Sequence, residues 1–249
     1  MEKISEWEGY KKIEFEVNGR MSFIVCPEKP LEGKPWVWRT EFFGAFDSAD
    51  RALLKEGWHL AYHKVSDMYG CPASVKMMKE FYDAAVSEYG LHEKPALFGF
   101  SRGGLYAVNF ASLYPDCAGV LYLDAPVLDI RSWPGGKGKG RGEASCWKEC
   151  MACYGLTEET AKNFADIPLN KAEKNAANGI PVILVYGDSD EDVPCEENAL
   201  IYYERYKKIS DKIKIIGKPG CAHHPHSLED PAPITEFIDS EFGIRKSEI

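Results

Sequence analysis

Hydrophobic and polar positions along the chain form short segments that predict strands. Residues 11–26 divide at Asn18-Gly19, a dipeptide favoured in tight turns, into an alternating half and a largely apolar half, so we expect an antiparallel hairpin there. The later apolar runs are more continuous, which is typical of strands that are buried on both faces. They lie at 35–40, 57–63, 96–100, 117–124, 180–186 and 212–217.

Segments with apolar residues at three- and four-residue spacing lie between these strands and predict helices. The longest, 72–89, begins with a proline, which is favoured in a first helical turn, and its apolar stripe ends at Tyr89. A short helix at 49–56 has Asp47 or Ser48 as its N-cap. Further helices are expected at 105–114, about 195–209 and 231–241. This alternation predicts an α/β fold with an eight-stranded, mostly parallel sheet and helices on both faces.

The length of the chain, 249 residues, permits one large core, so we expect a single domain over residues 1–249. The interval 127–178 departs from the strand and helix alternation. It contains a glycine-rich stretch and two helix-like pieces, and it is too long for a simple crossover between strands. We interpret it as a cap inserted over the strand ends.

Charge and composition narrow the class of protein. The net charge of −9 excludes a dense basic face for neutralising phosphates, so no nucleic-acid partner is expected. No run of eighteen apolar residues is present, and the first residues lack an apolar signal region, so we expect a cytoplasmic protein without a membrane partner unless a leader was removed. The eight irregularly spaced cysteines are expected to be mostly buried, reduced thiols. The oligomeric state cannot be inferred.

Residues 96–104 contain the main candidate for chemistry. Ser101 stands between Gly99 and Gly103 at G-x-S-x-G spacing, after an apolar run and before a helical pattern. This spacing is typical of a nucleophile elbow, where the chain turns sharply from a buried strand into a helix and the neighbours of the serine must lack bulk. We therefore expect Ser101 to be a nucleophile; the alternative is a glycine-rich turn with a solvated serine.

Two further motifs follow in the chain. They are Gly-Asp-Ser-Asp-Glu-Asp-Val-Pro at 187–194 and Gly-Cys-Ala-His-His-Pro-His at 220–226. Together with the elbow, in the order Ser, Asp, His, they make the chain resemble the α/β-hydrolase superfamily over essentially its whole length. The resemblance implies two leading antiparallel strands, six more strands, an elbow after the fifth strand and a cap after the sixth.

The resemblance also indicates an acid and a base. A G-x-x-D-x-x-V-P pattern in the superfamily selects Asp190 as the acid, and Asp124, at the end of the sixth strand, is the rival. A histidine shortly before the last helix in similar proteins falls on His223. The alternatives His224 and His226 are expected to be a packed and a surface histidine.

In the mechanism that this resemblance implies, His223 accepts the proton of Ser101 while Asp190 holds the opposite ring nitrogen and so fixes the tautomer. The flanking acids Asp188 and Asp192 are expected to cap the turn or the following helix.

An acyl-transfer site also requires donors for the developing oxyanion. One candidate is the backbone N–H of Arg102, which starts the elbow helix. The common His-Gly of hydrolases is absent after the third strand, but Thr-Glu-Phe-Phe-Gly at 40–44 resembles the Gln-Glu-x-Phe-Gly of dienelactone hydrolases. That resemblance implies the N–H of Phe42 as the second donor. Glu41 then lies near the nucleophile, paired with Arg39 or Arg102, or is an ordinary charge at a strand end.

These residues favour a serine hydrolase, and we expect a carboxylesterase that cleaves a small soluble ester through an acyl-enzyme on Ser101. A thioesterase, lactonase or peptidase uses the same machinery, and the fold does not choose among them. A ligand-binding protein or receptor on a hydrolase scaffold is the alternative from another class. No metal or organic cofactor is implied.

The glycine-rich stretch at 135–142 places three cations in an acidic chain, each separated from the next by one glycine. We consider two interpretations. One is a mobile, solvated connector. The other is a lid beginning at Trp133, in which Lys137, Lys139 and Arg141 attract an anionic substrate to the mouth of the site.

Overall fold

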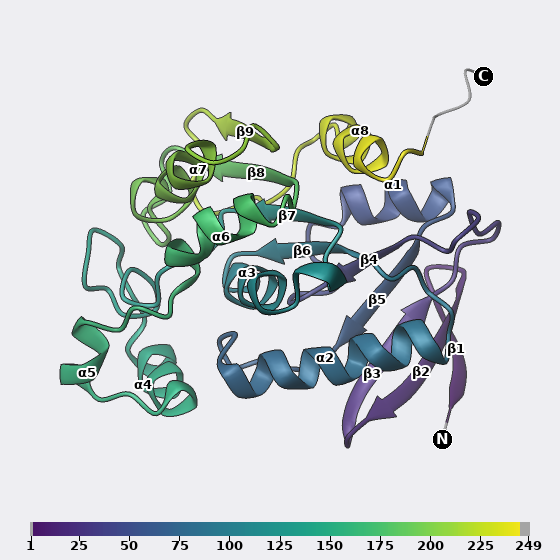
Figure 1. Ribbon diagram of the computed structural model, residues 1–249, viewed down its shortest axis with the longest axis horizontal. Coiled ribbons are helices and arrows are strands. Elements are labelled where there is room, and N and C mark those ends of the chain that lie inside the picture. The colour runs from purple at the N-terminus through teal and green to yellow at the C-terminus, as the bar shows by residue number, and fades with distance from the viewer. Residues whose placement is uncertain (1, 245–249) are drawn as a thin grey trace.

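A nine-stranded sheet forms the centre of the protein in the computed structural model, which describes residues 2–244 (Figure 1). The strand order is β1-β2-β3-β5-β4-β6-β7-β8-β9. The strands are β1 (Lys3–Trp7), β2 (Tyr10–Val17), β3 (Arg20–Val25), β4 (Trp36–Arg39), β5 (His59–His63), β6 (Ala96–Phe100), β7 (Val120–Asp124), β8 (Val182–Gly187) and β9 (Ile213–Lys218).

The sheet is mostly parallel, as the sequence predicted. Strands β1, β2 and β3 pair antiparallel in succession, and β3 pairs antiparallel with β5; every later pairing, from β4·β5 to β8·β9, is parallel. The predicted hairpin is present, with Asn18 and Gly19 at φ values of 50° and 75° in its turn. Antiparallel pairing of the leading strands allows such short connections, whereas the parallel strands require crossovers.

The prediction of eight strands was wrong by one. The additional strand, β1, pairs with β2 from Lys3 opposite Glu14 to Trp7 opposite Tyr10. None of its five residues is buried, so it has no apolar run of the kind that marked the other strands. An edge strand of this type is defined by its backbone partner and not by its side chains.

Helices occur at the predicted positions, with ends that differ from the predicted bounds by a few residues. They are α1 (Ser48–Glu56), α2 (Pro72–Ser87), α3 (Gly103–Leu113), α4 (Ala144–Tyr154), α5 (Glu158–Lys162), α6 (Ala172–Ala177), α7 (Ala199–Lys207) and α8 (Ala232–Glu241), with 3₁₀ turns η1 (Pro115–Cys117), η2 (Pro168–Lys171) and η3 (Cys195–Glu197). Asp47 is the N-cap residue of α1, but its side chain does not cap the helix and instead pairs with Arg51 at 2.9 Å.

The two faces of the sheet carry separate apolar cores, because neighbouring residues of a strand point to opposite sides. In β4, Trp36 and Trp38 pack into one core with α2, α3 and α7, while Val37 packs into the other. The second core includes Leu53 of α1 and Ile234 of α8, and these two helices lie side by side (Figure 1). The sheet is therefore covered on both faces.

The segment between β7 and β8, where a cap was expected at 127–178, contains α4, α5, η2 and α6. Figure 1 shows α4 and α5 beyond the end of the sheet toward which β6 points. Trp147 and Cys150 of α4 are buried in the first core, so the segment packs against the rest of the protein.

All eight cysteines are free thiols. Cys71, Cys150 and Cys195 are buried and the other five are partly exposed, so the expectation of mostly buried thiols was wrong. Among residues 2–244, no helix is long and apolar enough to span a lipid bilayer.

Two histidines of β5 are buried in the sheet. His59 is 4% exposed and His63 is 1% exposed, and the Nδ1 of His63 lies 2.9 Å from Ser22 Oγ. Burial lowers the pKa of each imidazole from 6.5 to about 4. Between about pH 4 and pH 6.5, both rings are therefore neutral in the folded protein, whereas the same histidines bind protons in the unfolded chain.

This difference in pKa between the folded and unfolded states predicts that acid destabilises the fold, because His59 and His63 of β5 bind protons only when the chain unfolds. The free energy of unfolding falls as the pH drops from 6.5 toward 4, by on the order of 3 kcal/mol for each histidine, and no further loss from these groups occurs below that range. We expect His63→Gln to have a shallower pH dependence than the unmodified protein in urea unfolding between pH 7 and 4. His92→Gln, at an exposed position, is the control. Identical slopes for the protein and His63→Gln would contradict the prediction.

Candidate active site

The turn between β6 and α3 has the backbone of a nucleophile elbow. Ser101 has a φ of 47°, a strained value for a residue with a side chain. A Cβ atom on Gly99 would lie 3.0 Å from the Cβ of Ala107, and one on Gly104 would lie 2.7 Å from the Cβ of Pro126. The glycines therefore allow α3 to pack closely against the elbow and the chain that follows β7.

Ser101 lies in a chain of hydrogen bonds with His223 and Asp190. The Oγ of Ser101 is 2.9 Å from Nε2 of His223, and Nδ1 of the same ring is 2.7 Å from Oδ2 of Asp190. Both His223 and Asp190 are buried, at 9% and 7% exposure. Because the carboxylate accepts the Nδ1 proton, the lone pair of Nε2 faces the serine hydroxyl.

The loop after β8 holds Asp190 in this orientation. Its second oxygen, Oδ1, accepts hydrogen bonds from the backbone N–H groups of Asp192 and Val193 at 3.0 and 2.8 Å. Asp188 lies apart from the histidine and accepts the N–H of Gly220 at 2.7 Å. Asp188 therefore binds the loop after β9, and not the turn or the following helix that it was expected to cap.

The rival acid, Asp124, contacts a different histidine. Its Oδ1 is 2.9 Å from Nδ1 of His226, and its Oδ2 accepts the hydroxyl of Tyr122 and the N–H of Ser227 at 2.7 and 2.8 Å. His226 is buried and His224 is exposed, which is the reverse of the expected placement. The hydrogen bond to the buried Asp124 accounts for the burial of His226. The site therefore contains two aspartate–histidine pairs, and Asp190 belongs to the one beside Ser101.

The loop after β4 brings the predicted oxyanion donor to the elbow. Phe42 has a φ of 54°, and its carbonyl accepts the N–H of Ala45 at 3.0 Å. Thr40 Oγ1 lies 2.9 Å from the carbonyl oxygen of Gly103, which joins this loop to the first turn of α3. Within residues 2–244, neither the N–H of Phe42 nor that of Arg102 has a hydrogen-bond acceptor. Both donors are therefore available to a ligand.

Glu41 pairs with Arg102, which was one of the two expected partners. Nη2 of Arg102 donates to Oε2 of Glu41 at 3.2 Å and lies 2.9 Å from Oδ1 of Asp67. Burial raises the pKa of the Glu41 carboxyl, and the adjacent guanidinium opposes that shift. Two carboxylates therefore hold the side chain of Arg102.

Arg39, the other expected partner of Glu41, instead pairs with Asp50 of α1. The two side chains are fully buried, with Nε 2.9 Å from Oδ1. Arg39 also donates to the carbonyl of Ala45, and its guanidinium stacks 3.8 Å from the ring centre of Phe100. This ion pair therefore anchors the loop that carries Phe42.

A small cavity of about 180 Å³ opens beside Ser101. Three aromatic side chains and the histidine loop form most of its wall. Its lining residues are Phe42, Ala45, Phe46, Phe100, Ser101, His223, His224 and His226.

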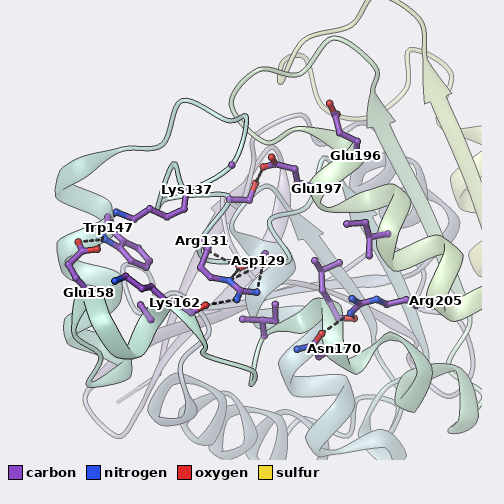
Figure 2. Close-up of a pocket in the computed structure, with 16 residues that line it drawn as sticks. Asp129, Arg131, Lys137, Trp147, Glu158, Lys162, Asn170, Glu196, Glu197 and Arg205 are labelled. Carbon is purple, nitrogen blue, oxygen red and sulfur yellow. Dashed lines mark hydrogen bonds and ion pairs between the residues drawn. The ribbon is translucent and has the colours of Figure 1, made fainter.

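A larger cavity, of about 590 Å³, lies between α4, α5 and α7 (Figure 2). Charged side chains line it, including Arg131, which binds Asp129, and Arg205, which binds Asn170. Neither Ser101, His223 nor Asp190 lines this cavity. It is therefore separate from the serine and its partners.

The three cations of the glycine-rich stretch are each paired with a glutamate. The pairs are Lys137 with Glu158, Lys139 with Glu196, and Arg141 with Glu191. Lys137 lines the larger cavity, and Trp133 packs 6.4 Å from the ring of Tyr69. The stretch therefore joins the cap to the loop that follows Asp190, and its positive charges are neutralised by neighbours. This arrangement does not support the attraction of an anionic substrate to the serine.

Sequence patterns did not reveal two features of the site. The pair of Asp124 and His226 and the pair of Arg39 and Asp50 each join residues from different elements of the chain. The only sequence signals were the position of Asp124 at a strand end and the three histidines within four residues.

Solved structures similar to this chain are hydrolases by description. A puromycin-hydrolysing peptidase from Mycobacterium tuberculosis superimposes with a TM-score of 0.67 at 15% identity, over 94% of this chain and 39% of the peptidase. Est1E from Butyrivibrio proteoclasticus has a TM-score of 0.63 at 16% identity, over 97% of this chain and 99% of Est1E. An α/β-hydrolase enzyme from a lagoon-sediment metagenome of Mar Chica, Morocco, has a TM-score of 0.56 at 15% identity, over 97% and 98% of the two chains.

No protein-family model and no curated protein sequence matches the chain. At these low identities the structural likeness establishes the fold. The chain spans about two fifths of the peptidase, so the activity of that whole protein is not carried over.

The buried pair of Arg39 and Asp50 predicts a large effect on stability. Arg39→Met leaves the Asp50 carboxylate buried without its partner, which costs about 3–5 kcal/mol of unfolding free energy. Arg51→Met is the matched control, because Arg51 is 40% exposed and its ion pairs contribute about 0–1 kcal/mol. Urea unfolding measures both variants. Equal losses in the two variants would show that the buried pair does not anchor the loop.

Proposed function

We propose that this chain, which has the α/β-hydrolase fold, is a serine hydrolase that cleaves small carboxylic esters with short acyl groups. The observation that carries the proposal is the hydrogen-bonded series from Ser101 through His223 to Asp190 beside a small cavity. A serine, a histidine and an acid with this connectivity form the machinery of acyl transfer on several unrelated folds. The likeness to solved hydrolase structures supports the same class.

In the first half of the reaction, Oγ of Ser101 attacks the ester carbonyl carbon while its proton passes to Nε2 of His223. Asp190 keeps the Nδ1 proton in place and stabilises the imidazolium. The negative charge that develops on the carbonyl oxygen is accepted by the N–H groups of Phe42 and Arg102. His223 then returns its proton to the leaving alkoxide, and the alcohol departs from an acyl-enzyme.

In the second half, water repeats the attack. His223 removes a proton from the water molecule, the resulting hydroxide adds to the acyl carbon, and the same two N–H groups hold the oxyanion. Collapse of this intermediate breaks the bond to Oγ, which takes back the proton from His223. The products are the free carboxylic acid and the original enzyme.

The size of the cavity supports a short acyl group. Its volume of about 180 Å³ is below the ~300–1,000 Å³ of pockets that enclose drug-sized ligands. Phe42, Phe46 and Phe100 supply most of its apolar wall. A methyl or ethyl group fits this environment better than a long chain or a charged group.

Replacement of the nucleophile provides the direct test of the proposal. Ser101→Ala should reduce hydrolysis of p-nitrophenyl acetate by at least about 10⁴-fold and abolish labelling by a fluorophosphonate, because the attacking oxygen is lost. The unmodified protein should hydrolyse the acetate faster than the octanoate. Ser87→Ala, on the exposed end of α2, is the matched control. Unchanged turnover in Ser101→Ala would refute the hydrolase assignment.

A second prediction tests Asp190 as the acid that orients His223. Asp190→Asn should lower kcat by up to about 10⁴-fold, because an amide in place of the carboxylate favours the wrong tautomer of His223. Asp188→Asn is the control, since Asp188 caps the neighbouring loop and does not touch the ring. Steady-state kinetics on the acetate ester measure both variants. A loss of similar size in Asp188→Asn would mean that loop structure, and not the tautomer, explains the effect.

A further inference from the structure

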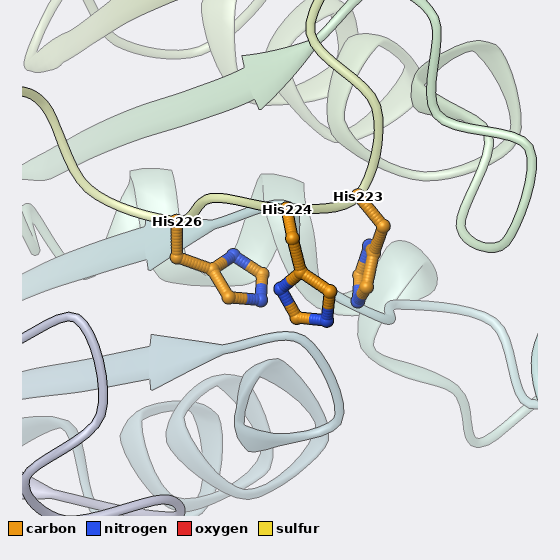
Figure 3. Close-up of side chains that lie close together, drawn as sticks. All are labelled: His223, His224 and His226. Atoms are coloured by element: carbon orange, nitrogen blue, oxygen red, sulfur yellow. The ribbon is translucent and has the colours of Figure 1, made fainter.

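Three histidines of the loop after β9 lie close together (Figure 3), and one of them, His223, contacts Ser101. The ring centres of His223, His224 and His226 are 4.9 Å apart in all three pairs, and the rings lie at steep angles to each other. One ring nitrogen from each lies within 4.8 Å of the others. Imidazole nitrogens bind zinc, copper, nickel and cobalt, so this arrangement has the ligand chemistry of a transition-metal site.

Two of the three rings are already oriented by carboxylates. Asp190 accepts the Nδ1 proton of His223 at 2.7 Å, and Asp124 accepts that of His226 at 2.9 Å. In each ring the free lone pair is therefore on Nε2. A carboxylate behind the ring is the usual second partner of a metal-binding histidine, because it fixes the tautomer and raises the basicity of the ligand nitrogen.

Access and charge also suit a cation. His224 is exposed, with its ring stacked 5.3 Å from that of Phe46, so solvent reaches the cluster without opening the core. The buried carboxylates of Asp190 and Asp124 lie directly behind the other two rings. Their negative charges balance the two positive charges of a bound divalent ion and so favour its binding.

We propose that His223, His224 and His226 bind one divalent transition-metal ion, of which zinc is the representative, and that this ion inhibits the serine. Three protein ligands leave one position open on a tetrahedral zinc ion. His223 Nε2 has a single lone pair, which either accepts the hydroxyl of Ser101 or binds the metal. Inhibition rests on the proposed hydrolase function; metal binding does not.

Metal titration of the whole protein tests the binding. We would add zinc and follow heat release, and add cobalt and follow its visible absorption, for the unmodified protein, His224→Ala and His92→Ala. His224 is suitable for replacement because it is exposed, and His92 is an exposed histidine outside the cluster. We expect one zinc per chain in the unmodified protein and in His92→Ala, and binding at least about tenfold weaker in His224→Ala.

The free cysteines are competing ligands, and cobalt distinguishes them. Thiolate ligands produce intense near-ultraviolet charge-transfer bands, which imidazole ligands do not. We expect none of these bands at one equivalent of cobalt, and Cys221→Ser, in the same loop, to bind as tightly as the unmodified protein. Thiolate bands, equal affinity in His224→Ala, or no binding at millimolar zinc would each overturn the proposal.

Hydrolysis of p-nitrophenyl acetate then tests the consequence. Zinc should inhibit the unmodified protein with a half-inhibiting concentration close to its dissociation constant, and a chelator should restore activity. The rates of His224→Ala are expressed relative to its own rate without metal. In this variant the half-inhibiting zinc concentration should rise by at least about tenfold. Zinc binding without any esterase activity would refute the hydrolase function and leave the metal site intact. Zinc binding at the three histidines without inhibition would overturn the inhibitory role.

Discussion

The close packing of α3 against β6 is the constraint on which the site depends. Ser101 is held at a φ of 47° because its neighbours Gly99 and Gly104 let the helix approach to distances that a Cβ atom would not permit. The same turn is tied to the adjacent strand, since the N–H of Ser101 donates to the carbonyl of Asp124 at 2.9 Å. Strain in the serine backbone is thus compensated by packing and hydrogen bonding around it. Every other group of the site is placed relative to this turn.

Two aspartate–histidine pairs meet beside the turn, and they differ in what lies on the far side of each ring. The ring held by Asp190 faces the hydroxyl of Ser101, whereas the ring held by Asp124 faces its neighbouring histidines. The carboxylate acts alike in both pairs, by fixing the proton on Nδ1 and the lone pair on Nε2. In our proposals, this arrangement supports proton transfer at His223 and metal binding at both His223 and His226.

Buried charged pairs also hold the loop that carries Phe42 and the residue after Ser101. The pair of Arg39 and Asp50 holds the loop through the carbonyl of Ala45, and Glu41 pairs with Arg102, the residue after Ser101. Such pairs contribute little net stability, but leaving either partner alone is costly, so they favour one conformation.

Apolar periodicity and glycine spacing, which are local properties of the sequence, predicted the fold class, most of the strands and helices, and the turn at Ser101. The resemblance to α/β-hydrolases indicated Asp190 and His223, because it rests on short local motifs. The sequence did not reveal β1, whose exposed residues carry no such apolar pattern. Only the tertiary structure decided which acid meets which histidine. Asp124 ends β7 and Asp190 follows the neighbouring parallel strand β8, and both contact histidines of the same loop. Their partners depend on distances between side chains that are remote in sequence, which no local pattern encodes.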